Sequence, residues 1–90
     1  MQVSVITAVY NQGQYARQAV ESALAQPETA EVLLVEDGST DDSLTICEQL
    51  AAEYEQVRLL RHPGGANRGY PATLNLGIVS SRYEYIAFID

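Results

Sequence analysis

The 90-residue sequence contains no lysine and no tryptophan, and its five basic residues are all arginines. Twelve acidic residues bring the formal net charge to −7 and the isoelectric point to about 4.4. A protein that neutralises nucleic-acid phosphates needs a basic face, so this charge balance excludes nucleic acid as a partner. An anionic small ligand would need a metal ion or a local arginine to offset the acidic field.

The sequence also has one cysteine, Cys47, and one histidine, His62, so it offers neither an internal disulfide nor a zinc-binding cluster. Cys47 falls in a helical pattern and is expected to be a small buried apolar residue. No apolar run is long enough to span a membrane. Met1 is followed by strand-like sequence rather than by the basic start of a signal peptide, so we expect a cytoplasmic protein.

Apolar segments alternate between strand and helix periodicity along the whole chain. Strands are predicted at 3–9, 31–35, 57–61 and 85–89, and helices at 14–25, 42–54 and 71–79. This order predicts one α/β domain over residues 1–90, a Rossmann-like three-layer α/β/α sandwich with a mainly parallel sheet. We expect Tyr15 on the buried face of the first helix, Leu74 and Ile78 on that of the third, and Asn11 as a helix cap.

The stretch 32–43 is the most informative part of the sequence. An unbroken Val/Leu run ends in Glu36 and Asp37, followed by Gly38 and by hydroxyl and acidic residues that can cap the next helix. Open α/β sheets place ligands at the carboxyl ends of their strands, where these two acids should lie. They therefore point to a ligand with N–H or O–H donors, or to a cation. The alternative is that both acids only cap the next helix.

Three further groups should gather at the same edge of the sheet. The Tyr10 ring could stack on a flat ligand while the backbone of Ala8 and Val9 contacts it; alternatively, the ring packs at the sheet edge. Asp90 ends the fourth strand, beside the first strand, where a carboxylate suits a sugar hydroxyl or a metal; alternatively, this terminal residue is frayed and unused. The glycine-rich loop 64–69 follows the third strand and has Ala66 at its third position, so it is not a dinucleotide fingerprint.

The remaining polar groups near this loop have competing interpretations. Arg61 and Arg68 could meet phosphate through paired N–H donors, or they could form a solvated face. The loop itself could be a flexible surface turn. His62 is a lone histidine beside a turn, so we expect a surface residue. No acid is placed to orient it, so no serine–histidine–acid set is assigned.

Four stretches of the sequence, 3–11, 34–43, 75–78 and 84–90, together resemble the start of a family 2 inverting glycosyltransferase of the GT-A fold. The resemblance implies a nucleotide-sugar donor, most often linked to UDP, and transfer of the sugar to a hydroxyl of a saccharide, lipid or protein acceptor. It implies that the backbone around Ala8 and Val9, with Tyr10, borders the base. It also implies that Asp37, with Glu36, accepts from the base N3–H, since a carboxylate is acceptor-only.

By the same resemblance, Asp90 is the first acid of an Asp-x-Asp motif that holds the ribose and a Mg or Mn ion on the diphosphate. Two positions depart from the family: Glu36 replaces the commoner aspartate, and Leu74 stands where arginine is frequent. The remaining motif acids and the general base lie in no part of this sequence, so no catalytic residue is assigned. We expect the nucleotide-binding half of a longer enzyme, inactive on its own.

Two other classes of protein compete with this hypothesis. A non-catalytic α/β fragment could self-associate into a homo-oligomer through an exposed sheet edge, because unpaired strand edges are templates for pairing. A phosphoacceptor signalling domain shares the α/β alternation but needs acids after the first strand, where Tyr10 and Asn11 stand.

Overall fold

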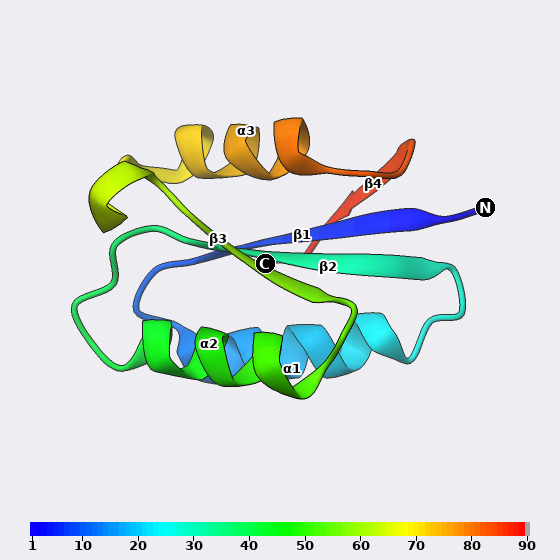
Figure 1. Cartoon of the computed structure of the whole chain (residues 1–90), viewed down its shortest axis with the longest axis horizontal. Helices are drawn as coiled ribbons and strands as arrows, with labels where there is room; N and C mark the ends of the chain where they lie inside the picture. Colours follow the sequence, from blue (N-terminus) through cyan, green and yellow to red (C-terminus); the bar gives the residue numbers. More distant parts are fainter. Residues whose placement is uncertain (90) are drawn as a thin grey trace.

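Four parallel strands form the centre of the structure, a computed structural model that describes residues 1–89 (Figure 1). The sheet order is β3-β2-β1-β4, so the longest strand, β2, is central. The strands are β1 (Val3–Val9), β2 (Thr29–Glu36), β3 (Val57–Arg61) and β4 (Tyr85–Phe88). The helices are α1 (Gly13–Leu24), α2 (Ser43–Glu53), the 3₁₀ turn η1 (Pro63–Gly65) and α3 (Tyr70–Ser80). The predicted order of elements and the placement of β4 beside β1 are confirmed.

The helices lie on both faces of the sheet, as the α/β alternation predicted (Figure 1). Helices α1 and α2 cover one face, where most of the buried apolar residues gather, and α3 covers the other above a smaller cluster of Ile6, Leu33 and Val35. Successive side chains of a strand point to opposite faces. The unbroken apolar run of β2 therefore supplies both cores, and Val32 to Val35 are all fully buried.

Two side chains predicted to be buried are exposed instead. Tyr15 on α1 is 62% exposed and Ile78 on α3 is 42% exposed. The reason on α3 is that the helix contacts the sheet through its small residues, Thr73 and Gly77. A Cβ at Gly77 would come within 2.6 Å of Ile6 Cγ2, so only glycine allows this close approach. Leu74 packs partly against the smaller cluster, as expected.

Cys47 is fully buried, in agreement with the sequence prediction. Burial, together with the nearby charges of Glu36 and Glu48, raises the pKa of its thiol to about 12. The thiol is therefore protonated at neutral pH and contributes to packing between α2 and the sheet. Among residues 1–89, no helix has the length and apolar character needed to cross a membrane.

The open edge of the sheet at β4 carries exposed aromatic side chains. Tyr85 and Phe88 are each 50% exposed, and β4 pairs with β1 along its other side. Self-association through this edge stays a prediction, which sedimentation equilibrium over a concentration series would test. A strict monomer at high concentration would contradict it.

A buried carboxylate, Glu31, ties the segment after α3 to the start of β2. It accepts hydrogen bonds from Ser4 Oγ at 2.7 Å, Arg58 Nη1 at 3.0 Å and the Arg82 backbone N–H at 2.8 Å. Arg58 also donates to the Ser80 carbonyl at the end of α3. Burial alone would raise the pKa of Glu31, but these hydrogen bonds and the Arg58 charge outweigh it, so the pKa lies below its usual 4.5.

Replacing Glu31 by glutamine should lower the free energy of unfolding at pH 7 by about 2 kcal/mol, because Arg58 loses its buried partner. The pKa of Glu31 is lowered in the folded state, so its contribution is complete above pH 4.5 and disappears as the pH falls through the folded value. Urea unfolding followed by circular dichroism should therefore show the two proteins converging in acid. Glu28→Gln is the matched control, because Glu28 is an exposed acid that directly precedes β2. An equal stability of Glu31→Gln and wild type at pH 7 would contradict the assignment.

Candidate functional site

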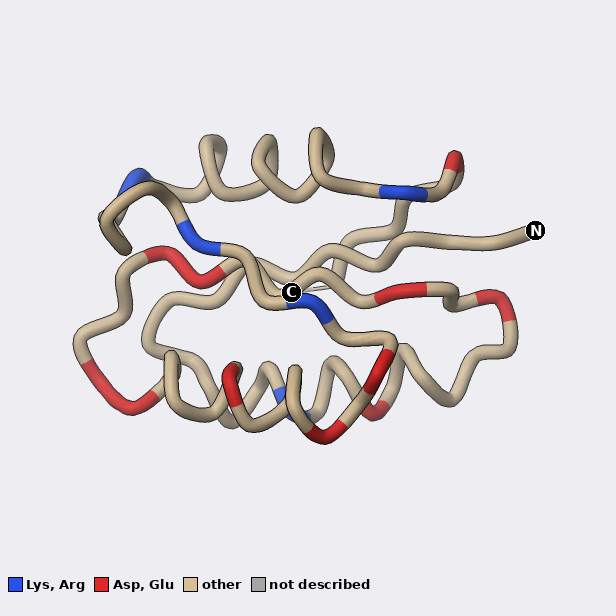
Figure 2. The backbone as a smooth tube through the Cα atoms, viewed as in Figure 1, with Lys and Arg blue, Asp and Glu red and all other residues tan. Residues whose placement is uncertain are grey.

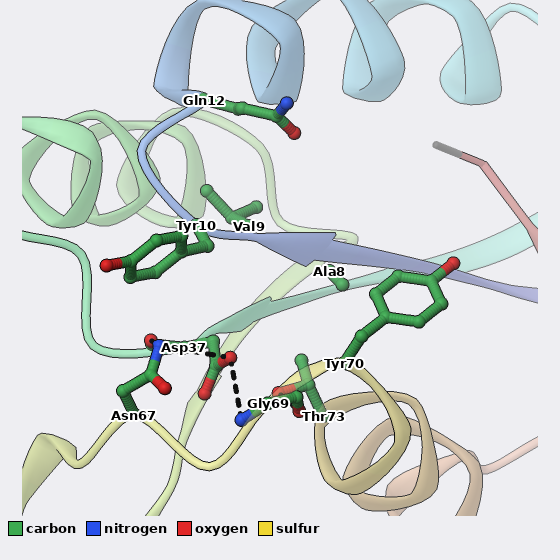
Figure 3. Close-up of a pocket in the computed structure, with 9 residues that line it drawn as sticks. All are labelled: Ala8, Val9, Tyr10, Gln12, Asp37, Asn67, Gly69, Tyr70 and Thr73. Atoms are coloured by element: carbon green, nitrogen blue, oxygen red, sulfur yellow. Dashed lines mark hydrogen bonds between the residues drawn. The ribbon is translucent and has the colours of Figure 1, made fainter.

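The carboxyl ends of β1 and β2 and the start of α3 border a cleft of about 620 Å³ (Figure 3). Four of the predicted site residues line it: Ala8, Val9, Tyr10 and Asp37. Five further residues were not among the predictions: Gln12, Asn67, Gly69, Tyr70 and Thr73. Asp90 lies outside the residues that the structure describes. The cleft thus has the position that open α/β sheets give to their ligand sites.

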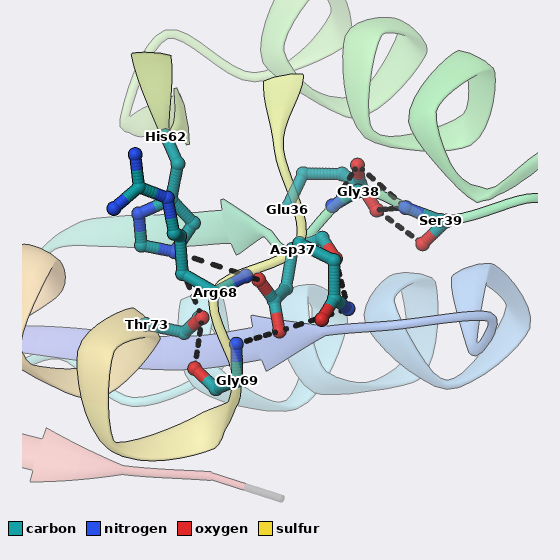
Figure 4. A network of polar contacts seen from close by, with 9 residues as sticks. Glu36, Asp37, Gly38, Ser39, His62, Arg68, Gly69 and Thr73 are labelled. Atoms are coloured by element: carbon teal, nitrogen blue, oxygen red, sulfur yellow. Dashed lines mark hydrogen bonds and ion pairs between the residues drawn. The ribbon is translucent and has the colours of Figure 1, made fainter. Parts of the chain in front are cut away.

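Glu36 and Asp37 point in opposite directions, because adjacent residues at a strand end follow the two-residue alternation of the strand. The Glu36 carboxylate accepts from the backbone N–H of Gly38 at 3.0 Å and of Ser39 at 3.1 Å, and from the Ser39 hydroxyl (Figure 4). Glu36 is 1% exposed and does not line the cleft. Glu36 therefore does not face the cleft; it stabilises the turn after β2, and it does not cap helix α2, which begins at Ser43.

Asp37 lies on the opposite face and holds the loop that precedes α3 (Figure 4). Its Oδ1 accepts from the Arg68 backbone N–H at 2.7 Å, and its Oδ2 accepts from the Gly69 backbone N–H at 3.1 Å. The Asn67 amide donates to the Asp37 carbonyl at 2.8 Å and approaches Oδ2 at 3.4 Å. A carboxylate is acceptor-only, so a set of N–H donors suits its charge. The glycine-rich loop is thus tied to β2 and is not a free surface turn.

The turn at Gly38 allows this loop to come close to β2. Gly38 has a φ of +71°, and a Cβ there would lie 2.7 Å from the Asn67 backbone N. A side chain at position 38 would therefore be strained and would push the loop away. Gly38 thus serves both the turn after β2 and the closure of one side of the cleft.

His62 is buried, which contradicts the expectation of a surface histidine. It is 8% exposed, and its Nε2 lies 3.0 Å from Thr73 Oγ1 and 3.5 Å from Asp37 Oδ1 (Figure 4). The acid that the sequence analysis did not find is thus Asp37. The parallel pairing of β2 and β3 matches Glu36 with Arg61, so the next residues, Asp37 and His62, are neighbours. Aligning the ends of the two predicted strands in parallel would therefore have shown from the sequence that Asp37 and His62 are neighbours.

Asn11 joins the loop after β1 to the loop after β2, whereas the sequence predicted a helix cap. It has a φ of +54°, a conformation that asparagine tolerates. Its Oδ1 accepts from the backbone N–H of Thr40 at 2.9 Å and of Asp41 at 3.3 Å, and its own N–H donates to Ser39 Oγ at 2.9 Å. Gln12 occupies the N-cap position of α1 and makes no side-chain cap hydrogen bond there. Asn11 thereby fixes the backbone next to Tyr10, whose 46% exposed side chain lines the cleft.

The charges around the site are unevenly distributed. Four of the five arginines lie in β3 or next to α3 (Arg58, Arg61, Arg68 and Arg82), while many acids lie around α1 and α2 (Figure 2). Arg61 lies over the loop, since a Cβ at Gly65 would meet its guanidinium. Neither Arg61 nor Arg68 lines the cleft. Within residues 1–89, no group of three or more His, Cys, Asp or Glu side chains is arranged to hold a metal ion.

Comparisons with known proteins agree on one family. A family model for glycosyl transferase family 2 matches residues 4–90. The uncharacterized glycosyltransferase YibD of Escherichia coli is 40% identical over 89 residues, which are 98% of this chain and 25% of YibD. The structure of S. aureus TarS 1–349 in complex with UDP-GlcNAc is 28% identical with a TM-score of 0.81, over 100% of this chain and 26% of that one. The mannosyltransferase PcManGT from Pyrobaculum calidifontis, solved with GDP-Man and Mn²⁺, has the same fold (TM-score 0.80, 21% identity, 94% of this chain and 26% of that one). The chain thus spans about a quarter of the length of each of these three proteins.

Replacing Asp37 by asparagine should release the loop before α3, because one of the two oxygens that accept from the Arg68 and Gly69 N–H groups becomes an NH2 group, which can only donate. Hydrogen exchange followed by NMR should show faster exchange of these two amides, by about tenfold or more, while the amides of β1 and β2 keep their protection. Asp42→Asn, at an exposed acid that makes no side-chain cap at the start of α2, is the control and should change neither amide. Unchanged exchange of Arg68 and Gly69 in Asp37→Asn would contradict the role given to Asp37.

Proposed function

The chain belongs to glycosyl transferase family 2, and on this premise we propose that its cleft binds the nucleotide of a nucleotide-sugar donor, with a UDP-sugar as the first candidate. The observation that carries the proposal is the convergence of Tyr10, the backbone of Ala8 and Val9, and Asp37 on one cleft at the carboxyl edge of the sheet. TarS, which is 28% identical over the whole chain, has been solved with UDP-GlcNAc. These residues offer an aromatic ring, backbone groups and an anionic acceptor, which together suit a base and its N–H.

The aromatic part of the site consists of Tyr10 and Tyr70. Both side chains line the cleft and are about half exposed, at 46% and 51% (Figure 3). Stacking of a nucleobase on an aromatic side chain is worth about 1–3 kcal/mol. We propose that Tyr10, which follows β1 directly and is held by its neighbour Asn11, provides the stacking surface.

The polar part of the site is Asp37, which we propose accepts the base N3–H. A carboxylate offers about four acceptor positions. Two of these are taken by the short bonds from the Arg68 and Gly69 N–H groups, and the Asn67 and His62 contacts are longer, at 3.4 and 3.5 Å. We propose that the base N–H takes the Oδ2 position that the Asn67 amide approaches only to 3.4 Å, while the Arg68 and Gly69 bonds fix the carboxylate. Glu36 is left out of the proposed site, because its carboxylate is engaged by the turn after β2.

A divalent metal, Mg²⁺ or Mn²⁺, stays a proposal for the diphosphate, with Asp90 as the one ligand that this chain would supply. Residues 1–89 contain no metal cluster, so they do not form such a site by themselves and we derive no step through a metal. If the metal bridges Asp90 and the diphosphate, adding Mn²⁺ should lower the Kd for UDP at least threefold relative to buffer with EDTA. The same Kd in both buffers, measured by calorimetry, would contradict this part of the proposal.

The reaction of the whole protein is proposed from the family: an acceptor hydroxyl attacks the anomeric carbon of the donor sugar, and the nucleoside diphosphate leaves. This chain would serve as the nucleotide-binding part of such a hexosyltransferase. None of its residues is assigned as the general base. The acceptor, whether saccharide, lipid or protein, and a cytoplasmic location stay predictions from the sequence.

Replacing Tyr10 by alanine should raise the Kd for UDP by about tenfold, since each 1.4 kcal/mol of lost stacking is a factor of ten. Isothermal titration calorimetry on the 90-residue chain measures this directly. Tyr15→Ala is the matched control, because Tyr15 is 62% exposed on α1 and does not line the cleft. Equal effects of the two substitutions would argue against a base at Tyr10, and a wild-type chain that is folded but binds no UDP would overturn the proposal.

A further inference from the structure

His62 is a buried residue that lies behind the cleft and does not line it. It follows β3 directly, and its ring contacts both the Asp37 carboxylate and Thr73 on α3 (Figure 4). Both of these neighbours do line the cleft. His62 is therefore placed to influence the cleft only through other residues.

The hydrogen bonds of Thr73 decide which ring nitrogen of His62 carries a hydrogen. The Thr73 hydroxyl donates its one hydrogen to the Gly69 carbonyl oxygen at 2.8 Å. Only lone pairs of Thr73 Oγ1 then remain to face His62 Nε2, 3.0 Å away, so Nε2 must be the donor. The other group near Nε2 is Asp37 Oδ1 at 3.5 Å, which is an acceptor as well. Both neighbours thus require a hydrogen on Nε2.

We propose that His62 is a positioning residue whose Nε2–H links the Asp37 carboxylate to Thr73. This link fixes the end of β2 relative to the start of α3, which are two sides of the cleft. Asp37 directly follows β2, and Thr73 lies at the start of α3. The backbone N–H groups of Arg68 and Gly69 hold the Asp37 carboxylate from the loop before α3. His62, which follows β3, supplies a further donor from another direction. The effect on nucleotide binding rests on the proposed function; the position of the hydrogen does not.

Removing the His62 donor would leave two buried acceptors, Thr73 Oγ1 and Asp37 Oδ1, with one partner fewer. Thr73 is fully buried and Asp37 is 5% exposed, so water cannot readily replace the lost donor. The loop bonds from Arg68 and Gly69 would remain, so the chain should still fold. The carboxylate and the start of α3 would be held less firmly, and a ligand that contacts Asp37 would bind more weakly.

The position of the hydrogen can be measured by NMR without any ligand. The chain has a single histidine, so long-range ¹H–¹⁵N correlations of the imidazole ring need no assignment. The proposal expects the pattern of a ring with a hydrogen on Nε2, and an altered Nε2 shift in Thr73→Val but not in Thr73→Ser, which keeps the hydroxyl. A ring with its hydrogen on Nδ1 alone and a bare Nε2 would overturn it.

The coupling to the cleft is tested by the Kd for UDP in three His62 and Thr73 variants, each checked for folding by its amide spectrum. His62→Phe keeps a flat ring without a donor and should raise the Kd about three- to tenfold. His62→Gln, whose amide nitrogen can take the place of Nε2, should restore at least half of the loss in binding free energy. Thr73→Val should weaken binding in the same direction, and it provides the test if the Phe variant does not fold.

The matched control for Thr73→Val is Thr45→Val, at an exposed threonine of α2, which should bind UDP as wild type does. Wild-type affinity in both His62→Phe and Thr73→Val would overturn the positioning role. A wild-type chain that binds no UDP would overturn the proposed function instead, and the NMR pattern alone would then decide the assignment of His62.

Discussion

The hydrogen bonds that the Asp37 carboxylate accepts are the interaction on which the cleft depends. They join the end of β2 to the backbone N–H groups of Arg68 and Gly69, immediately before α3. Burying a carboxylate is costly unless hydrogen-bond donors surround it, and burying a backbone N–H group is costly unless it has an acceptor. Here the Asp37 carboxylate and the two N–H groups satisfy each other. The loop is thereby fixed close to β2, and Gly38 permits that approach because it has no Cβ.

Helix α3 is held at both ends by carboxylates from one face of β2. Glu31 and Asp37 lie six residues apart in sequence, on the side of β2 that also presents Leu33 and Val35 to α3. Glu31 accepts from the Arg82 N–H after the helix, and Asp37 accepts from the Arg68 and Gly69 N–H groups before it. The apolar cluster beneath α3 is the smaller of the two cores. The hydrogen bonds at the two ends of α3 therefore help to fix the position of this helix. They also fix the side of the cleft that carries Thr73 and Tyr70.

The sequence alone predicts the layers and the order of elements along the chain, because they follow from the spacing of apolar segments and turn residues. Of the order of strands in the sheet it predicts only that β4 lies beside β1. It also identifies the region of the site, since the residues after β1 and β2 must meet at one sheet edge. Ile78 was placed wrongly because α3 contacts the sheet through Thr73 and Gly77. Tyr15 was placed wrongly because α1 buries a narrower stripe of small residues and Val20. His62 was misjudged because its partner, Asp37, becomes visible only when β2 and β3 are set in register. The left-handed backbone of Asn11 has no signal in its own residue type that separates it from a helix cap.

The central claim is that the ends of β1 and β2 and the start of α3 form one nucleotide site. The most direct test is to map UDP onto the chain through the amide chemical shifts of the ¹⁵N-labelled protein. The account predicts shifts that saturate together and that are concentrated at residues 8–12, 37–39 and 67–73, with little change along α2. A folded sample that shows no shifts, or shifts concentrated at the β4 edge, would contradict it.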